Sequence, residues 1–138
     1  VQAVRTADLS ADVGGRIVAT SEALRAGGKF LVGEELLRLD PTDFELAIVQ
    51  QEAAVARAEL RLQQERAEAE AARSAWRELE GERPADPLAL REPQIRDAEA
   101  ELAAARALLA KRRLDLQRTR VLAPFAGRVQ SVTADLGQ

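Results

Sequence analysis

The sequence has 138 residues, of which 46% are apolar, 31% are charged and only 3% are aromatic, and its net charge is −3. It contains no histidine and no cysteine, which excludes catalytic groups built on those residues, disulfides, and the usual zinc and haem sites. Interspersed charges leave no basic stripe for nucleic acid, and no apolar run approaches the roughly 20 residues that cross a bilayer. We therefore expect no catalytic residue, cofactor or metal ligand. The absence of methionine indicates a processed or trimmed piece of a longer chain.

The first 42 residues are typical of short β-strands joined by turns. Gly27-Gly28 and Gly33 punctuate this stretch, and Asp40-Pro41 ends it. The β-branched and alternating segments between these breaks predict three strands: Asp12–Ala19, Lys29–Val32 and Glu35–Asp40.

A long helix is predicted from Thr42 to about Glu80, where glycine and proline are absent. Pro41 and the acidic Asp43 suit a helix N-terminus. Every seventh residue forms one side of a seam: Ile48, Val55, Leu62, Ala69 and Trp76. The companion positions three residues on hold Gln51, Ala58, Glu65, Ala72 and Leu79. This a/d pattern, interrupted only by Gln51 and Glu65, predicts a coiled-coil arm of roughly 55–60 Å.

Glycine and prolines interrupt the pattern at residues 81–92, and it resumes from Pro93 for about 26 residues. The seam of this second arm is Ile95, Leu102, Leu109 and Leu116. We therefore expect an antiparallel helical hairpin over residues 43–119 with its tip at about 81–92, where Leu88 and Leu90 add an extra turn. Trp76 is expected in its core.

Charges along both arms are expected to form a solvated face, with weak pairs such as Glu59–Arg66 and Glu68–Arg61. Asp97 and Glu101 lie four residues apart and are expected to repel slightly, with no role as acid and base.

The two ends of the chain share a motif. Ala11–Ile17 and Ala123–Val129 both follow the pattern A-x-x-x-G-R-(I/V), and a glycine turn follows each, at Gly27-Gly28 and at Gly137. Residues 1–42 and 120–138 are therefore predicted to be two halves of one β-module that flank the hairpin, in an elongated α+β fold. The second half stops before a counterpart of Lys29–Asp40, so we expect it to be truncated or completed by residues outside this sequence.

A β-module of two similar halves resembles the lipoyl/biotinyl fold, although neither Lys29 nor Lys111 lies in the motif that carries the modified lysine of that fold. With a helical hairpin between the halves, the chain resembles the periplasmic adaptor subunits, or membrane fusion proteins, of bacterial tripartite efflux pumps. Val32–Pro41 and Leu116–Val129 carry this resemblance, the latter matching L-x-x-T-x-(I/V)-x-A-P-F-x-G-x-V. The string Pro87–Gln94 is similar to adaptors of resistance-nodulation-division transporters. The resemblance implies structural roles for Gly15, Gly28, Gly33, Asp40, Pro124, Gly127 and Gly137.

The resemblance also implies a function without catalysis. It implies a periplasmic protein of a Gram-negative bacterium that associates with the inner membrane and self-associates into a ring. Its partners would be an inner-membrane transporter and, at the hairpin tip, an outer-membrane channel. The tip signature of many adaptors is absent, so the contact residues are expected from the position of the tip at the end of the hairpin. Its apolar residues and the arginines beside them are Leu88, Leu90, Arg83 and Arg91. Alternatives are a lipoyl- or biotinyl-type carrier domain, an adaptor of an ABC-type exporter, and a plain scaffolding coiled coil.

Overall fold

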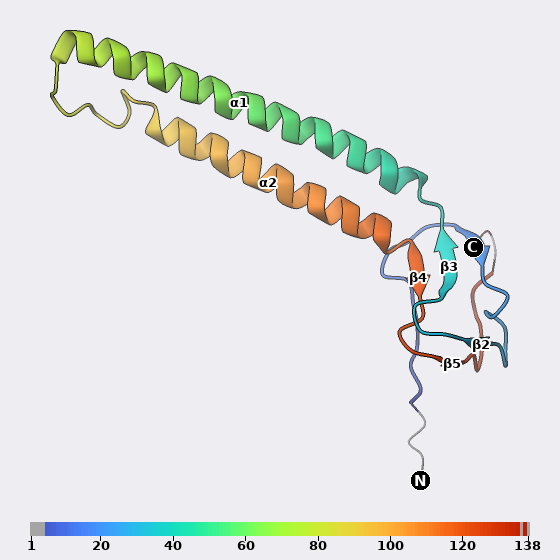
Figure 1. Ribbon diagram of the computed structural model, residues 1–138. Helices are drawn as coiled ribbons and strands as arrows, with labels where there is room; N and C mark the ends of the chain where they lie inside the picture. Colours follow the sequence, from blue (N-terminus) through green and yellow to red (C-terminus); the bar gives the residue numbers. More distant parts are fainter. Residues whose placement is uncertain (1–4, 136, 138) are drawn as a thin grey trace. The chain divides into compact units, whose positions relative to one another are not determined.

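The computed structural model describes residues 5–135 and 137 (Figure 1). Leu136 and Gln138, which end the second half-motif, lie outside the described residues. The elements follow in the order β1 Ile17–Thr20, β2 Lys29–Phe30, β3 Glu35–Leu39, α1 Thr42–Glu80, α2 Glu92–Gln117, β4 Arg120–Leu122 and β5 Gly127–Arg128. Two compact units result: the β-module, from Val1–Glu45 and Arg113–Gln138, and the hairpin unit, Leu46–Arg112. Their boundaries fall inside the two helices, whereas the sequence placed them at the helix ends.

Both ends of the chain build the β-module, as predicted. β3 lies between β1 and β4 in an antiparallel three-stranded sheet, and β2 pairs with β5 in a second, two-stranded one. Strands from the first half therefore pair with strands from the second. The buried apolar side chains of this unit are Ile17, Leu36, Leu39, Val121 and Ala123.

All three predicted strands are shorter in the structure, the third by Asp40 alone. The segment predicted over Asp12–Ala19 is extended only from Ile17, and the one over Lys29–Val32 ends at Phe30. The second difference has a local cause, because the chain turns at Gly33, which has a φ of 79°. Glu34 closes that turn by accepting the Leu31 N–H on its side chain at 2.9 Å and donating its own N–H to the Leu31 carbonyl.

The start of α1 follows from its sequence. The Asp40 carboxylate accepts hydrogen bonds from the Thr42 backbone N–H at 3.0 Å and from the Thr42 hydroxyl at 2.7 Å. Asp40 thus caps the start of α1. Pro41 directly precedes the first helical residue, where its missing N–H leaves no helical bond unmade, and its carbonyl accepts the Glu45 N–H at 2.9 Å. The two bonds from Thr42 lower the pKa of the Asp40 carboxyl.

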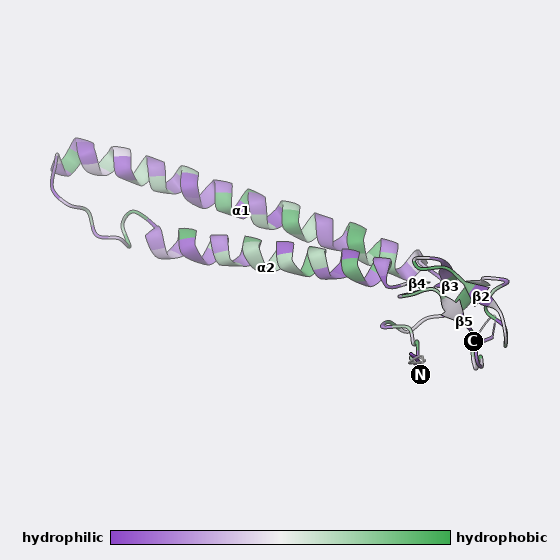
Figure 2. Ribbon diagram, turned by 60° about the horizontal axis from the view of Figure 1, so that its bottom comes forward, coloured by the Kyte–Doolittle hydropathy of each residue, from purple (hydrophilic) through white to green (hydrophobic). Residues whose placement is uncertain are grey.

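The two helices form an antiparallel hairpin whose core is a small apolar cluster (Figure 1). Leu62, Ala98 and Leu102 are buried there, with Val55, Ala58 and Ile95 packed against them. Both helices are otherwise hydrophilic, with apolar residues at intervals (Figure 2). The polar residue that interrupts the seam at Gln51 makes its own bond across it, donating from Nε2 to the Ala105 carbonyl at 2.9 Å.

The prediction of the ion pairs Glu59–Arg66 and Glu68–Arg61 is wrong, because each of these residues pairs with a different partner. Glu59 binds Arg106 at 3.0 Å, and Arg66 binds Glu99 at 3.3 Å. The reason is geometric, since residues seven apart on one helix lie two turns apart, whereas the facing helix is close. Such exposed pairs contribute little singly. The expected repulsion between two α2 carboxylates is likewise offset, because one α1 guanidinium binds both, in the trio Arg61, Asp97 and Glu101.

Candidate functional site: the hairpin tip

The tip of the hairpin is long because the two helices differ in length. α1 has 39 residues and α2 has 26, and Glu65 of α1 lies level with Arg91 at the start of α2. The remaining turns of α1 face the connecting segment 81–91 rather than a second helix (Figure 1). This explains why Leu79, a predicted seam position, is 83% exposed. The heptad prediction is wrong there because no helix faces the residue.

The first part of the connection is tied to the end of α1. Gly81 ends the helix in a left-handed conformation, with a φ of 65°. Trp76 is half-buried, and its indole N–H donates to the Arg83 carbonyl at 2.7 Å. Trp76, predicted in the core of the coiled coil, is thus only half-buried and lies outside the buried cluster. Its hydrogen bond holds the tip loop against the end of α1.

The second part of the connection is a single helical turn. The Asp86 carboxylate accepts the Leu88 N–H at 2.9 Å, and the Leu90 N–H donates to the Asp86 carbonyl at 3.2 Å. Asp86 thus acts as an N-cap, with Pro87 at the first position. The extra turn predicted at Leu88 and Leu90 is present, but the left-handed Arg91 separates it from α2.

Arg91 joins the tip to α1. Its Nε lies 2.8 Å from a Glu65 carboxylate oxygen and 3.0 Å from one of Glu68. The hydrogen bond from Arg91 lowers the pKa of the Glu65 carboxyl. Glu65 is the second polar residue that interrupts the seam, so both interruptions carry a bond across the hairpin.

The four expected tip residues have different environments. Leu88 is 65% exposed, the Arg83 side chain is also exposed, and Leu90 is half-buried. Arg91 is occupied by its two ion pairs. The residue that sequence reasoning missed is Leu79, because its place in the seam pattern predicted burial. Leu79, near the end of α1, and Leu88, in the connecting segment, are thus two exposed leucines of the tip.

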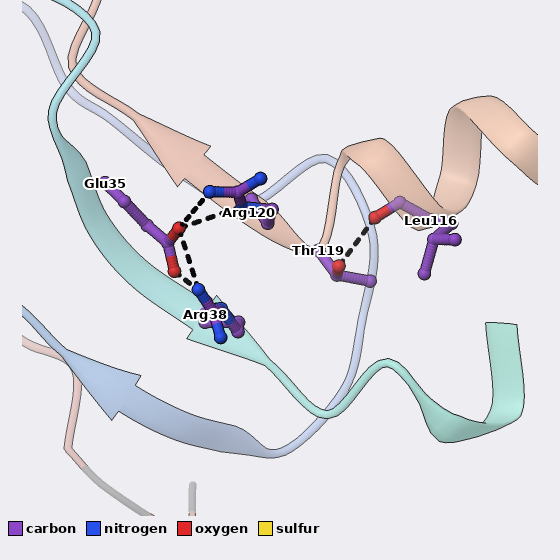
Figure 3. A network of polar contacts seen from close by, with 5 residues as sticks. All are labelled: Glu35, Arg38, Leu116, Thr119 and Arg120. Carbon is purple, nitrogen blue, oxygen red and sulfur yellow. Dashed lines mark hydrogen bonds and ion pairs between the residues drawn. The ribbon is translucent and has the colours of Figure 1, made fainter. Parts of the chain in front are cut away.

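The β-module shows why several motif residues occur. A side chain at Gly28 would place its Cβ 2.0 Å from the Ala23 carbonyl oxygen, so only glycine fits there. Thr119, which is 2% exposed, donates its hydroxyl to the Leu116 carbonyl at 2.6 Å (Figure 3). Its own carbonyl accepts the Leu39 N–H at 2.8 Å. Thr119 of the L-x-x-T motif therefore ends α2 through its hydroxyl and connects the end of this helix to β3 through its carbonyl.

A carboxylate between two arginines lies beside this junction (Figure 3). Glu35 binds Arg38 on its own strand at 2.6 Å and Arg120 on β4 at 2.7 Å. These two partners outweigh the effect of burial and lower the pKa of the Glu35 carboxyl.

Over residues 5–135 and 137, no cluster of acidic side chains has the arrangement of a metal site. The same part of the chain holds no helix with the length and apolarity to cross a membrane. What the tip offers is a shaped, partly apolar surface at the end of a helical hairpin.

No protein-family model and no curated protein sequence matches the chain. Solved structures do. A candidate efflux transporter from Bacteroides eggerthii has 18% identity and a TM-score of 0.72, over 100% of this chain and 37% of its own. The membrane fusion protein Spr0693 from Streptococcus pneumoniae has 25% identity and a TM-score of 0.65, over 88% and 48%. A MacA–MexA chimera with the Pseudomonas aeruginosa MexA α-hairpin domain has 23% and 0.67, over 99% and 43%.

The chain thus spans less than half the length of these three proteins. A further similar structure is the periplasmic adaptor protein EmrA, with 15% identity and a TM-score of 0.63. These similarities confirm the resemblance that the sequence motifs indicated. The chain thus has the fold of the corresponding part of these membrane fusion and periplasmic adaptor proteins.

Proposed function

We propose that the chain is the hairpin and β-module part of a periplasmic adaptor, a non-catalytic subunit of an efflux assembly. In this role it links an inner-membrane transporter to an outer-membrane channel in a Gram-negative bacterium, and copies of it associate in a ring. The string Pro87–Gln94 favours a transporter of the resistance-nodulation-division type over an ABC-type exporter. The exported compound is chosen by the transporter.

The observation that carries this proposal is the exposed tip. Leu79, near the end of α1, is 83% exposed and Leu88, in the connecting segment, is 65% exposed. Trp76 and Arg91 hold that segment against α1. An apolar surface on a pre-shaped loop loses less conformational entropy on docking than a flexible polar loop does. The tip therefore suits contact with a protein partner, which we assign as the outer-membrane channel.

The carrier-domain alternative receives no support from the two lysines. Lys29 lies in β2, paired with Arg128 of β5, and Lys111 lies within α2. Neither is at the tip of a β-hairpin, where a lipoyl or biotinyl group would have to swing between active sites.

In-cell photo-cross-linking tests the proposed partner. A photoreactive residue at Leu88 is expected to capture an outer-membrane channel, while the same residue at the exposed Leu60, midway along α1, is not. Capture of a cytoplasmic protein at Leu88 would refute both the location and the role. Equal capture of the channel from both positions would refute the tip as the docking surface.

A further inference from the structure

Arg91 occupies a backbone conformation that glycine normally supplies. The Glu92 N–H donates to the Pro87 carbonyl at 3.0 Å, and the Arg91 N–H donates to the Leu88 carbonyl at 3.1 Å. This pair of bonds is the Schellman motif, whose fifth residue is left-handed and is most often glycine. Arg91 holds that position with a φ of 57°, the one positive φ among the non-glycine residues that the structure describes.

A side chain at this position is unfavourable for the backbone, so its contacts must explain it. The guanidinium reaches across the hairpin to Glu65 and Glu68 of α1. The Glu65 side chain is only 15% exposed, and that of Arg91 is 32% exposed, so this pair is better shielded from water than the ion pairs that Arg61, Arg66 and Arg106 make across the hairpin.

The start of α2 carries a second unfavourable feature beside the left-handed residue. The side-chain Oε1 of Gln94 is buried and has no hydrogen-bond partner. A buried acceptor without a partner costs free energy, so the first turn of α2 is held in place by contacts elsewhere. The ion pairs of Arg91, together with the packing of Ile95 against the Leu62 cluster, join this turn to α1.

We propose that Arg91 is a positioning residue of the tip: by bridging Glu65 and Glu68, it fixes the turn 86–91 against α1 and so sets where Leu88 stands. The inference rests on the docking role proposed above for the tip. Arg91 itself is then held within the hairpin, and the partner contacts the leucines that it positions.

Amide hydrogen exchange on this chain separates the side chain of Arg91 from its backbone conformation. Arg91→Gly relieves the left-handed strain but removes the bridge, so we expect exchange at the Glu92 amide to accelerate about two- to fivefold. Glu65→Gln, which keeps the backbone of the turn unchanged, is expected to produce an acceleration of similar size. Arg91→Lys keeps a charge that can reach Glu65 and should recover part of the protection.

The matched control is Glu70→Gln, which removes an α1 carboxylate whose partners, Arg73 and Arg77, lie on the same helix. It should leave exchange at Glu92 unchanged. Unchanged or slower exchange in Arg91→Gly would overturn the proposal, because the backbone alone would then account for the turn. The same holds if Glu65→Gln has no effect.

This measurement needs no partner, so its failure is distinguishable from failure of the docking role. Faster exchange in the variants, with no channel captured at Leu88, would support the positioning role of Arg91 and refute the docking role of the tip. Channel capture with exchange unchanged in both variants would support the docking role and refute the positioning role.

Discussion

The backbone N–H of Gly27 donates to the carbonyl of Val129 at 2.7 Å, which joins the turn of the first half-motif to the strand of the second. A reciprocal bond joins Gly137 to Ile17 at 3.0 Å. Ile17 and Val129 are equivalent positions of the repeated motif, and both glycines are left-handed, with φ of 79° and 85°. The repeat in the sequence is therefore a repeat in space, in which each half closes on the other.

Gly28→Ala is expected to destabilise the β-module, because its Cβ would lie 2.0 Å from the Ala23 carbonyl oxygen, a backbone atom that cannot move alone. Overpacking of this kind typically costs about 1–3 kcal/mol. The loss of stability can be measured by urea unfolding monitored through hydrogen exchange at the Gly27 amide. Gly14→Ala is the control, since nothing lies within 4 Å of a Cβ there. Equal stability of the two variants would contradict the close approach.

Glu35 should make the β-module sensitive to acid. Its pKa is lowered in the folded state by Arg38 and Arg120, so the unfolded chain binds the proton more tightly. The stabilisation is complete above the ordinary value of 4.5 and is lost as the pH falls through the lowered folded value. The free energy of unfolding, measured between neutral pH and pH 2, should depend less on pH in Glu35→Gln than in the wild type below about pH 4.5. The same pH dependence in both proteins would show that the ion pairs of Glu35 are not coupled to folding. Glu22→Gln, at an exposed position, is the control.

The seam predicts an unequal pair of leucine substitutions. Leu102 is 7% exposed and packs with Leu62 and Ala98, so Leu102→Ala is expected to cost about 2–3 kcal/mol. Leu108 is 37% exposed, and its replacement by alanine should change stability by less than about 0.5 kcal/mol. Thermal unfolding followed by helical circular dichroism compares them. A larger loss at Leu108 would mean that the other face of α2 is the packed one.

The sequence predicted the hairpin well because its signals are local and repeated. Prolines and glycines mark the helix ends, and the seven-residue spacing identifies Leu62 and Leu102 as facing residues. Burial at the tip was not predictable in this way. The heptad pattern of α1 continues through Leu79, but α2 begins only at Glu92, so no helix faces this part of α1. The role of Arg91 was also hidden, because a left-handed arginine has no sequence signature and its partner Glu65 looked like a defect in the seam.

The exposed tip leads to the last prediction, which concerns Leu88. Leu88→Asp should leave the hairpin folded, because the side chain is 65% exposed and its backbone N–H bond to the Asp86 carboxylate remains possible. Docking of an apolar surface would be lost, since a carboxylate buried in an interface without a partner is strongly unfavourable. In cells whose drug resistance depends on this protein, resistance should fall to the level of the deletion strain, while melting temperature and helicity stay close to wild type. Leu60→Asp, at an exposed site in the middle of α1, should preserve resistance. Resistance that survives Leu88→Asp in a folded protein would mean that the tip turn only closes the hairpin.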